Sequence, residues 1–231
     1  KNIQKYPEDV YNETHKLATT YNSCENGVVN RNPKNIKQAK QNPENYYYWI
    51  RYQYNLLEQN GKKSVTGTAM FIFLNKTGFR GLFRTGPNGF NVSCGHYKNP
   101  EIVNREHLFK IHELIQPVIF KCCDFTKSVK LPIKNDFVYI DPPYAPETKT
   151  SFVGYVSSGF GKECHELLFE NIHKLTDKYV NIIMSNASVS LVNEQFENEL
   201  YNVDTVICKR SINSKNPESK TEEVIISNFA L

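Results

Sequence analysis

In the stretch DFVYIDPPY, residues 136–144, an apolar run of aromatic and branched side chains is followed by Asp141 and two prolines. Such a run predicts a β-strand, and the prolines predict its end, because proline has no N–H to give to a sheet. In open α/β sheets, ligands bind beyond the carboxyl ends of the strands. Residues 141–144, Asp-Pro-Pro-Tyr, are therefore the first candidate site.

These four residues carry groups that suit a flat base with an amino group. Asp141 brings a carboxylate, the prolines leave their carbonyls free to accept hydrogen bonds, and Tyr144 brings a ring for stacking. Acceptors around an exocyclic amine favour a nucleophilic nitrogen and stabilise the charge that develops when it is methylated. The base must first leave the duplex, and stacking offsets part of that cost. The plainer alternative is a strand that ends in a Pro-Pro turn.

The C-terminal half around this motif reads as an α/β sheet. Short β-branched and aromatic runs predict strands at residues 118–125, 136–144, 180–188, 203–212 and 223–229. Between two of them, residues 162–179 carry an amphipathic stripe of Leu167, Leu168, Ile172 and Leu175, which predicts a helix. Strand, helix and strand at this spacing indicate a crossover unit of an open sheet.

The N-terminal half has a different texture. The pattern predicts helices over residues 1–22, 43–61 and 104–116, and a polar loop with room for one short helix over 22–43. The apolar run 68–76 fits a strand or a helix. Tight turns are expected over 78–97, because five glycines there forbid a regular helix. We place a boundary between the halves near residue 115.

Charge separates the same two regions. Residues 30–110 hold 13 Lys and Arg against 4 acidic residues, a local net charge of +9, whereas the rest of the chain nets −5. A basic region of this kind is the expected footprint of nucleic-acid binding, and arginines among aromatics on a turning loop suit contact with phosphates and bases. The alternatives are a merely solvated basic face and an ordinary glycine-rich surface loop.

Composition argues against several classes. Hydrophobic residues make up 39% of the chain, which supports a sizeable core. No apolar run approaches the roughly 20 residues of a membrane span, so we expect no membrane partner.

The six cysteines form no C-x-x-C pair, so reduced thiols are expected, with no metal site. No signal peptide is visible, which predicts a protein that is not secreted and resides in the cytoplasm or wherever the genome lies. The oligomeric state stays open.

Two blocks together resemble a known family. FLNKTGFRGLFRTGPNGFNVSCGHYK, residues 73–98, followed by YIDPPY, is similar to the Dam-type (D12 class) site-specific DNA adenine methyltransferases. That family carries LNR-x-GFNGL-x-R, then FNVP-x-G-x-Y. The resemblance runs from about Tyr46 to the end. It includes DF at 124–125, the loop APETKTSFVGY at 145–155 after the motif, MSNAS at 184–188 and KRSI at 209–212.

The resemblance implies methyl transfer from S-adenosylmethionine to the N6 amine of adenine in a short duplex DNA sequence. It implies a Rossmann-like α/β methyltransferase sheet, incomplete at its N-terminus, with an inserted, mostly helical target-recognition domain. The implied domains are residues 1–25, a helix of the catalytic domain, residues 26–115, the recognition domain, and residues 116–231, the catalytic core.

The resemblance also implies roles for single residues. Asp141 and the Pro142 carbonyl would bind the target amine, Pro143 would hold the turn, and Tyr144 would stack on the flipped base. The cofactor would contact Asp124, Phe125 and Asp141, although Asp124 could instead be a helix N-cap. Phe79 would wedge into the base stack, and the remaining implied DNA contacts are Lys76, Arg80, Leu82, Arg84, Asn91, Ser93, His96, Tyr97 and Lys98.

Departures from the family pattern define the alternatives. Members that read GATC usually carry other residues at Lys76, Arg80, Ser93 and His96, so a different site is expected. The family's F-x-G-x-G cofactor loop has no counterpart in the 231 residues, which fits a fragment that starts after the first strand. Two other readings stay open. One is a DNA-binding module without catalysis, and the other is an amino methyltransferase that acts on RNA or on protein glutamine.

Overall fold

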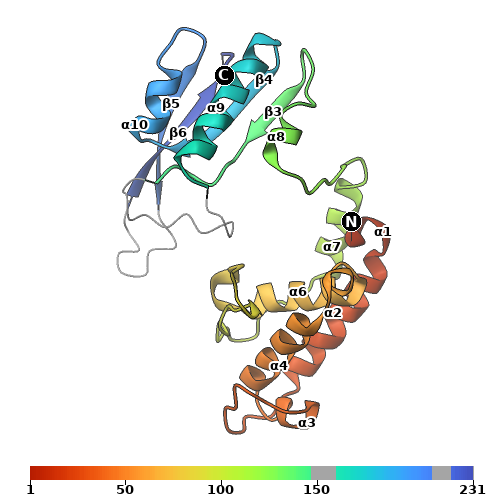
Figure 1. Cartoon of the computed structure of the whole chain (residues 1–231). Coiled ribbons are helices and arrows are strands. Elements are labelled where there is room, and N and C mark those ends of the chain that lie inside the picture. The colour runs from red at the N-terminus through yellow and green to blue at the C-terminus, as the bar shows by residue number, and fades with distance from the viewer. Residues whose placement is uncertain (147–159, 210–219, 231) are drawn as a thin grey trace. The chain divides into compact units, whose positions relative to one another are not determined.

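The computed structural model describes residues 1–146, 160–209 and 220–230 (Figure 1). The chain divides into two compact units, Lys1–Phe120 and Lys121–Leu231. This division falls close to the boundary expected near residue 115. Each unit has its own buried core.

The first unit is mostly helical. Its elements are α1 (Asn2–Lys5), α2 (Pro7–Asn22), α3 (Ile36–Ala39), α4 (Pro43–Leu56), α5 (Gln59–Lys62), α6 (Val65–Thr77), the 3-10 turn η1 (Phe79–Gly81), β1 (Thr85–Gly86), β2 (Gly89–Phe90) and α7 (Arg105–Leu114). The ambiguous run 68–76 is thus helical. Side-chain caps start these helices where the sequence offers Asn or Ser, as when Ser64 accepts from the Gly67 N–H at the start of α6.

The core of the first unit lies where α2, α4 and α6 meet. Tyr47, Phe73 and Leu74 are fully buried there, so much of the aromatic run of α4 is core. The helix expected to reach Gly61 ends at Leu56, because Leu57 adopts an extended backbone and the chain turns into α5. A Cβ at Gly67 would lie 2.4 Å from the Gly61 carbonyl oxygen, so the absence of a side chain lets α6 approach α5.

Residues 1–25 lie in this first unit, and α2 packs against α4, α6 and α7. Their assignment to a catalytic domain stays a prediction about the complete protein.

The second unit contains a four-stranded sheet with helices. Its elements are α8 (Phe125–Ser128), β3 (Phe137–Ile140), α9 (Lys162–Asp177), β4 (Asn181–Ala187), α10 (Ser190–Phe196), β5 (Asn202–Lys209) and β6 (Lys220–Ser227). The order across the sheet is β3-β4-β6-β5. β3 and β4 are parallel, and the other two pairings are antiparallel. Helix α9 connects the parallel pair, which confirms the expected crossover unit. Four of the five expected strands are present, within the described residues.

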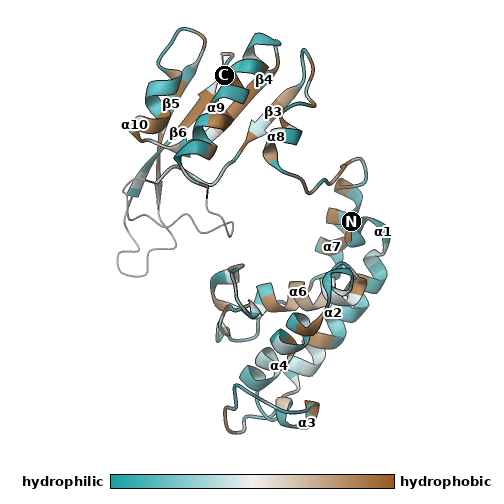
Figure 2. Cartoon of the chain, viewed as in Figure 1, coloured by the Kyte–Doolittle hydropathy of each residue, from teal (hydrophilic) through white to brown (hydrophobic). Residues whose placement is uncertain are grey.

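The core of this unit forms between α9, α10 and one face of the sheet. The buried stripe of α9 consists of His165, Leu168, Phe169, Ile172 and Leu175. Leu167, which the sequence placed in that stripe, is 42% exposed instead. Figure 2 shows the hydrophobic colour concentrated on the central strands β4 and β6.

The strand expected at residues 118–125 is wrong. Residues 118–124 are irregular and Phe125 begins α8. A strand needs a hydrogen-bonding neighbour, and in the described part of the chain β3 pairs with β4 alone. Val118, Ile119 and Phe120, which suggested a strand, are exposed, whereas Phe125 is half-buried against the core of the second unit.

Candidate active site and nucleic-acid interface

Asp141 follows β3 and is placed by the register of the parallel pair. Ile140 lies opposite Met184, so the next residues along the two strands, Asp141 and Ser185, are neighbours. The Ser185 hydroxyl donates to Asp141 Oδ1 over 3.1 Å. The carboxylate is exposed at the carboxyl end of its strand, where the sequence predicted a ligand site.

Tyr144 lies across the turn from this carboxylate. Its hydroxyl donates to Glu223 Oε2 over 3.3 Å, and its ring is half-buried. Burial raises the pKa of Tyr144, the neighbouring Ser185 hydroxyl lowers it, and the nearby charges of Glu223 and Asp141 raise it. The phenol therefore stays neutral near pH 7 and presents an uncharged ring.

Two buried side chains hold the backbone on either side of Tyr144. His165 Nε2 lies 3.0 Å from the Pro143 carbonyl oxygen, and Asn186 Oδ1 accepts from the Ala145 N–H over 2.8 Å. Asn186 Oδ1 also accepts from the Ala187 N–H over 2.9 Å, so its amide orientation is fixed by two donors. Neither side chain was predicted as functional. The signals available were a polar pair inside the apolar run of β4 and a histidine inside the buried stripe of α9.

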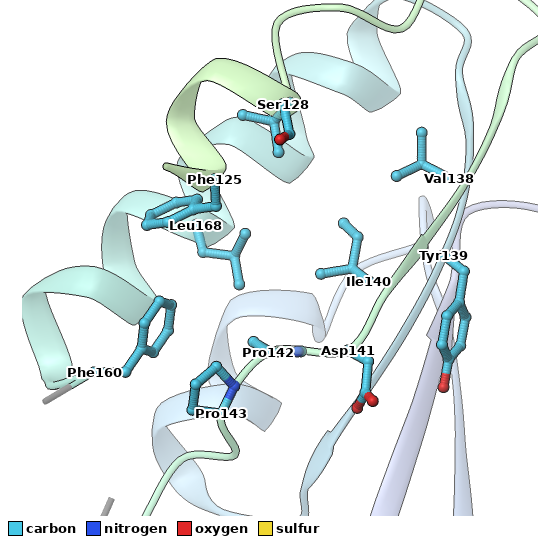
Figure 3. A pocket seen from close by; sticks show the side chains of 11 residues that line it. Phe125, Ser128, Val138, Tyr139, Ile140, Asp141, Pro142, Pro143, Phe160 and Leu168 are labelled. Atoms are coloured by element: carbon cyan, nitrogen blue, oxygen red, sulfur yellow. The ribbon is translucent and has the colours of Figure 1, made fainter. Parts of the chain in front are cut away.

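A pocket of about 330 Å³ opens beside the motif. Figure 3 shows Phe125, Phe160 and Leu168 facing Val138 and Ile140 across it. The full lining is Phe125, Ser128, Val129, Val138, Tyr139, Ile140, Asp141, Pro142, Pro143, Phe160 and Leu168. The pocket thus brings together Phe125 and Asp141, two of the three residues expected to contact a cofactor. Its apolar, aromatic walls suit a flat ring.

Asp124, the third of those residues, is the N-cap of α8. Its Oδ1 accepts from the Thr126 N–H over 3.0 Å and from the Thr126 hydroxyl over 2.5 Å. Both hydrogen bonds lower the pKa of Asp124, and the bond from the Thr126 hydroxyl has the larger effect. The helix-cap alternative is therefore confirmed. Among the described residues, none donates to its Oδ2, and cofactor contact by Asp124 stays a prediction.

In the first unit, the two halves of the glycine-rich block fold onto each other. A β-bridge joins Gly78 to Cys94, and the Phe79 N–H donates to the Ser93 carbonyl over 2.8 Å. Arg80 adopts a left-handed backbone with φ of 54°, and its N–H donates to the Tyr97 hydroxyl over 2.8 Å. The expected tight turns are present, and they gather residues that lie far apart in the sequence.

The predicted DNA-contacting residues share one property: apart from Leu82, which is half-buried against the core, all are exposed. The exposed ones are Lys76, Phe79, Arg80, Arg84, Asn91, Ser93, His96, Tyr97 and Lys98. Two of them bond each other, since Arg84 Nε donates to Asn91 Oδ1 over 2.8 Å and Arg84 Nη2 to the Asn91 carbonyl over 3.2 Å.

Helix α4 anchors this block through residues that the sequence did not single out. Tyr47 Oη and Arg51 Nη1 each donate to the Val92 carbonyl over 2.9 Å. Asn55 pairs with the Phe90 backbone through both its amide groups, at 2.9 and 2.8 Å. The hairpin β1–β2 is therefore tied to the helical core through its second strand.

Other candidate sites are scarce in the described ranges. No helix there is long and apolar enough to cross a membrane. No group of three His, Cys, Asp or Glu side chains with metal-binding geometry occurs among those residues. The cysteines, all within the described ranges, are unpaired.

A carboxylate and a half-buried tyrosine thus follow β3, and an apolar, aromatic pocket adjoins them. The D12 class N6 adenine-specific DNA methyltransferase family matches residues 8–212, and the chain belongs to this family. The resemblance stated from the two sequence blocks is thus confirmed.

Curated relatives agree with this assignment. The chain is 35% identical over 191 residues to Type II methyltransferase M.MjaIII of Methanocaldococcus jannaschii, covering 80% of this chain and 64% of the relative. It is 34% identical over 187 residues to the DNA adenine methylase of Haemophilus influenzae, covering 78% and 62%. It is 32% identical over 189 residues to the Retron Ec67 DNA adenine methylase of Escherichia coli, covering 80% and 62%. The chain thus spans a little under two thirds of the length of these relatives.

Proposed function

We propose that the complete protein transfers a methyl group from S-adenosylmethionine to the N6 amine of adenine in a short, specific sequence of duplex DNA. The proposal rests on the turn at residues 141–144, whose backbone is held by hydrogen bonds with buried side chains. Asp141 and Tyr144 lie on one short segment, and buried partners fix its backbone on both sides of Tyr144. Family membership supports the reaction class.

The catalytic roles follow from the chemistry of the turn. Asp141 and the Pro142 carbonyl accept hydrogen bonds from the target amine. These acceptors stabilise the positive charge that develops on the nitrogen. Tyr144 stacks on the extruded base, and its neutral ring offsets part of the unstacking cost. Pro143 keeps the turn rigid because its ring fixes φ.

The pocket beside Asp141 fits one end of the cofactor. Phe125 and Phe160 give an aromatic wall for an adenine ring, and Asp124 Oδ2 is available to accept from an adenine amine. When bound, S-adenosylmethionine supplies an electrophilic methyl group. The family's F-x-G-x-G loop is not among the 231 residues, so this chain offers part of a cofactor site. The segments resembling the family at 147–155 and 210–212 lie outside the described residues.

The first unit supplies DNA recognition in this proposal. Its basic charge and the exposed side chains of the glycine-rich block support contact with phosphates and base edges. We infer that residues 26–115 of this unit correspond to the target-recognition domain inserted into the catalytic fold. The sheet order in the second unit supports a methyltransferase core, with β3 at one edge of the described sheet.

The deciding experiment offers labelled S-adenosylmethionine to the intact protein with duplex DNA, RNA or a glutamine-containing protein. N6-methyladenine in the DNA, and no label in the other two, is the expected result. Label in RNA or protein would instead support the other amino-methyltransferase reading. Specific DNA binding without any methyl transfer would support a DNA-binding module, the reading that the absent F-x-G-x-G loop favours for this chain by itself.

A further inference from the structure

Ser185 lies outside the Asp-Pro-Pro-Tyr motif and yet contacts its carboxylate. The Ser185 hydroxyl oxygen is 3.1 Å from Asp141 Oδ1 and 3.1 Å from the Tyr139 hydroxyl. Ser185 is 8% exposed, whereas Tyr139 is 60% exposed. A row of three polar groups thus leads from the outer surface of β3 to the carboxylate.

The sheet register produces this row. Tyr139 and Asp141 are two residues apart, so they lie on the same side of the extended chain. In the parallel ladder Tyr139 lies opposite Ile183, and two residues further along β4 comes Ser185. Any shift of β4 by one residue would turn Ser185 to the other face of the sheet.

The direction of the hydrogen bonds is fixed by what each group can do. A carboxylate only accepts, so the Ser185 hydroxyl donates its one proton to Asp141. The Tyr139 hydroxyl must then donate to Ser185. This row occupies Asp141 Oδ1, and no described residue donates to Asp141 Oδ2.

We propose that Ser185, supported by Tyr139, is a positioning residue that fixes the orientation of the Asp141 carboxylate and leaves Oδ2 for the target amine. The inference rests on the proposed function, in which Asp141 binds that amine. Ser185 itself does not touch substrate. Its effect is to keep the carboxylate in one rotamer, so that the acceptor is already aimed when the base arrives.

The test compares the Ser185→Ala, Ser185→Thr and Tyr139→Phe variants of the intact protein. The matched control is Ser227→Ala, because Ser227 is also buried in the sheet but its hydroxyl donates to the Phe229 carbonyl over 2.9 Å. Single-turnover methylation, the KM for DNA and cofactor affinity are measured on folded protein.

Ser185→Ala should slow single-turnover methylation roughly tenfold or more, with KM and cofactor affinity within about twofold. Ser185→Thr should restore most of the methylation rate, because it returns the hydroxyl. Tyr139→Phe should reduce the rate less than Ser185→Ala does. Ser227→Ala should leave the rate per folded molecule unchanged. An unchanged rate in Ser185→Ala, or no rescue by a folded Ser185→Thr protein, would overturn the inference.

A second readout does not depend on catalysis. With ¹³C-labelled aspartate carboxyls, the Asp141 resonance should move in Ser185→Ala and stay in place in Ser227→Ala. A moved resonance in a protein that transfers no methyl group would uphold the positioning and refute the proposed function. An unmoved resonance would refute the positioning whatever the activity.

Discussion

His165 Nε2 lies 3.0 Å from the carbonyl oxygen of Pro143, so a side chain from the first turn of α9 contacts the backbone of the Asp-Pro-Pro-Tyr motif. The imidazole has no exposed surface, and its other ring nitrogen lies 3.0 Å from the Gly161 carbonyl. A partly buried carbonyl that loses its donor costs free energy, so this histidine links the geometry of the turn to the stability of the second unit.

Replacing this histidine tests that link. His165→Leu removes the donor, so it should lower the free energy of unfolding by about 1–3 kcal/mol and slow methylation. His165→Gln should retain more of the stability and more of the methylation rate. Thermal unfolding and single-turnover kinetics on the same preparations check this. His173→Leu is the matched control, because it is a half-buried histidine of α9 that bonds Tyr201 over 2.8 Å. If both leucine variants lost stability and rate equally, the turn would not be specially dependent on His165.

Removing the carboxylate of the motif should separate catalysis from binding. Asp141→Ala is expected to reduce methyl transfer by at least about 100-fold, since a transition-state hydrogen bond is lost, while DNA affinity stays within a few-fold. Asp204→Ala, at an exposed position of β5, is the control and should keep full activity. Methyl transfer and gel-shift binding are the measurements. Lost binding with preserved turnover would contradict the assignment.

Binding to DNA should weaken steeply with salt, because the basic first unit replaces counterions on the phosphates. Lys98→Ala or Arg84→Ala should each lower the slope of log affinity against log salt by about 0.9. Lys110 is in the same unit, but its amine pairs with Glu106 over 2.7 Å, so Lys110→Ala should leave the slope unchanged. Fluorescence anisotropy across a salt series measures the slope. Salt-independent affinity would refute this assignment of the interface.

The recognition sequence should contain adenine but differ from GATC. Lys76 and Arg80 stand where GATC readers usually carry other side chains, and a lysine lacks the rigid fork with which arginine reads guanine. Plasmid DNA methylated by the intact protein is digested with nucleases that N6-methyladenine blocks. We expect no protection at GATC. Protection there would show that these substitutions do not change the site.

The 231-residue chain by itself should bind S-adenosylmethionine poorly. Its pocket is lined by residues of α8, β3, the Asp-Pro-Pro-Tyr turn, the segment before α9 and α9 itself. No glycine loop of the F-x-G-x-G type is available to form another wall. Calorimetric titration should give no saturable signal at concentrations that saturate the intact protein. Tight binding together with methyl transfer to DNA would show that the site is complete without that loop.

The strand end at residues 141–144 was predictable because its signal is local. An apolar run followed by Asp-Pro-Pro-Tyr predicts a strand end from neighbouring residues alone, and Phe137–Ile140 is a strand. The partners of that motif were not predictable in the same way. Ser185 and Asn186 approach it only through the register of β3 with β4, and His165 only through the packing of α9.

The strand expected at 118–125 is absent for a related reason, because local sequence does not show whether a neighbouring strand is available. Its residues have strand propensity, but propensity acts only where a neighbouring strand offers hydrogen bonds. In the first unit, the turns over 78–97 were predictable from glycine positions, whereas the helical state of 68–76 was decided by burial of Phe73 and Leu74.

The bonds between Arg84 and Asn91 bear on how this surface meets its ligand. A guanidinium has five N–H donors, and Asn91 engages two of them, which leaves three along the outer edge. A long side chain loses about 1.5–2 kcal/mol of rotamer freedom when it is immobilised, and here that loss occurs when the hairpin folds. In the proposed complex, Arg84 would therefore meet a phosphate or a guanine with its direction already set. The nucleic acid, more than this side chain, would then have to adapt its shape.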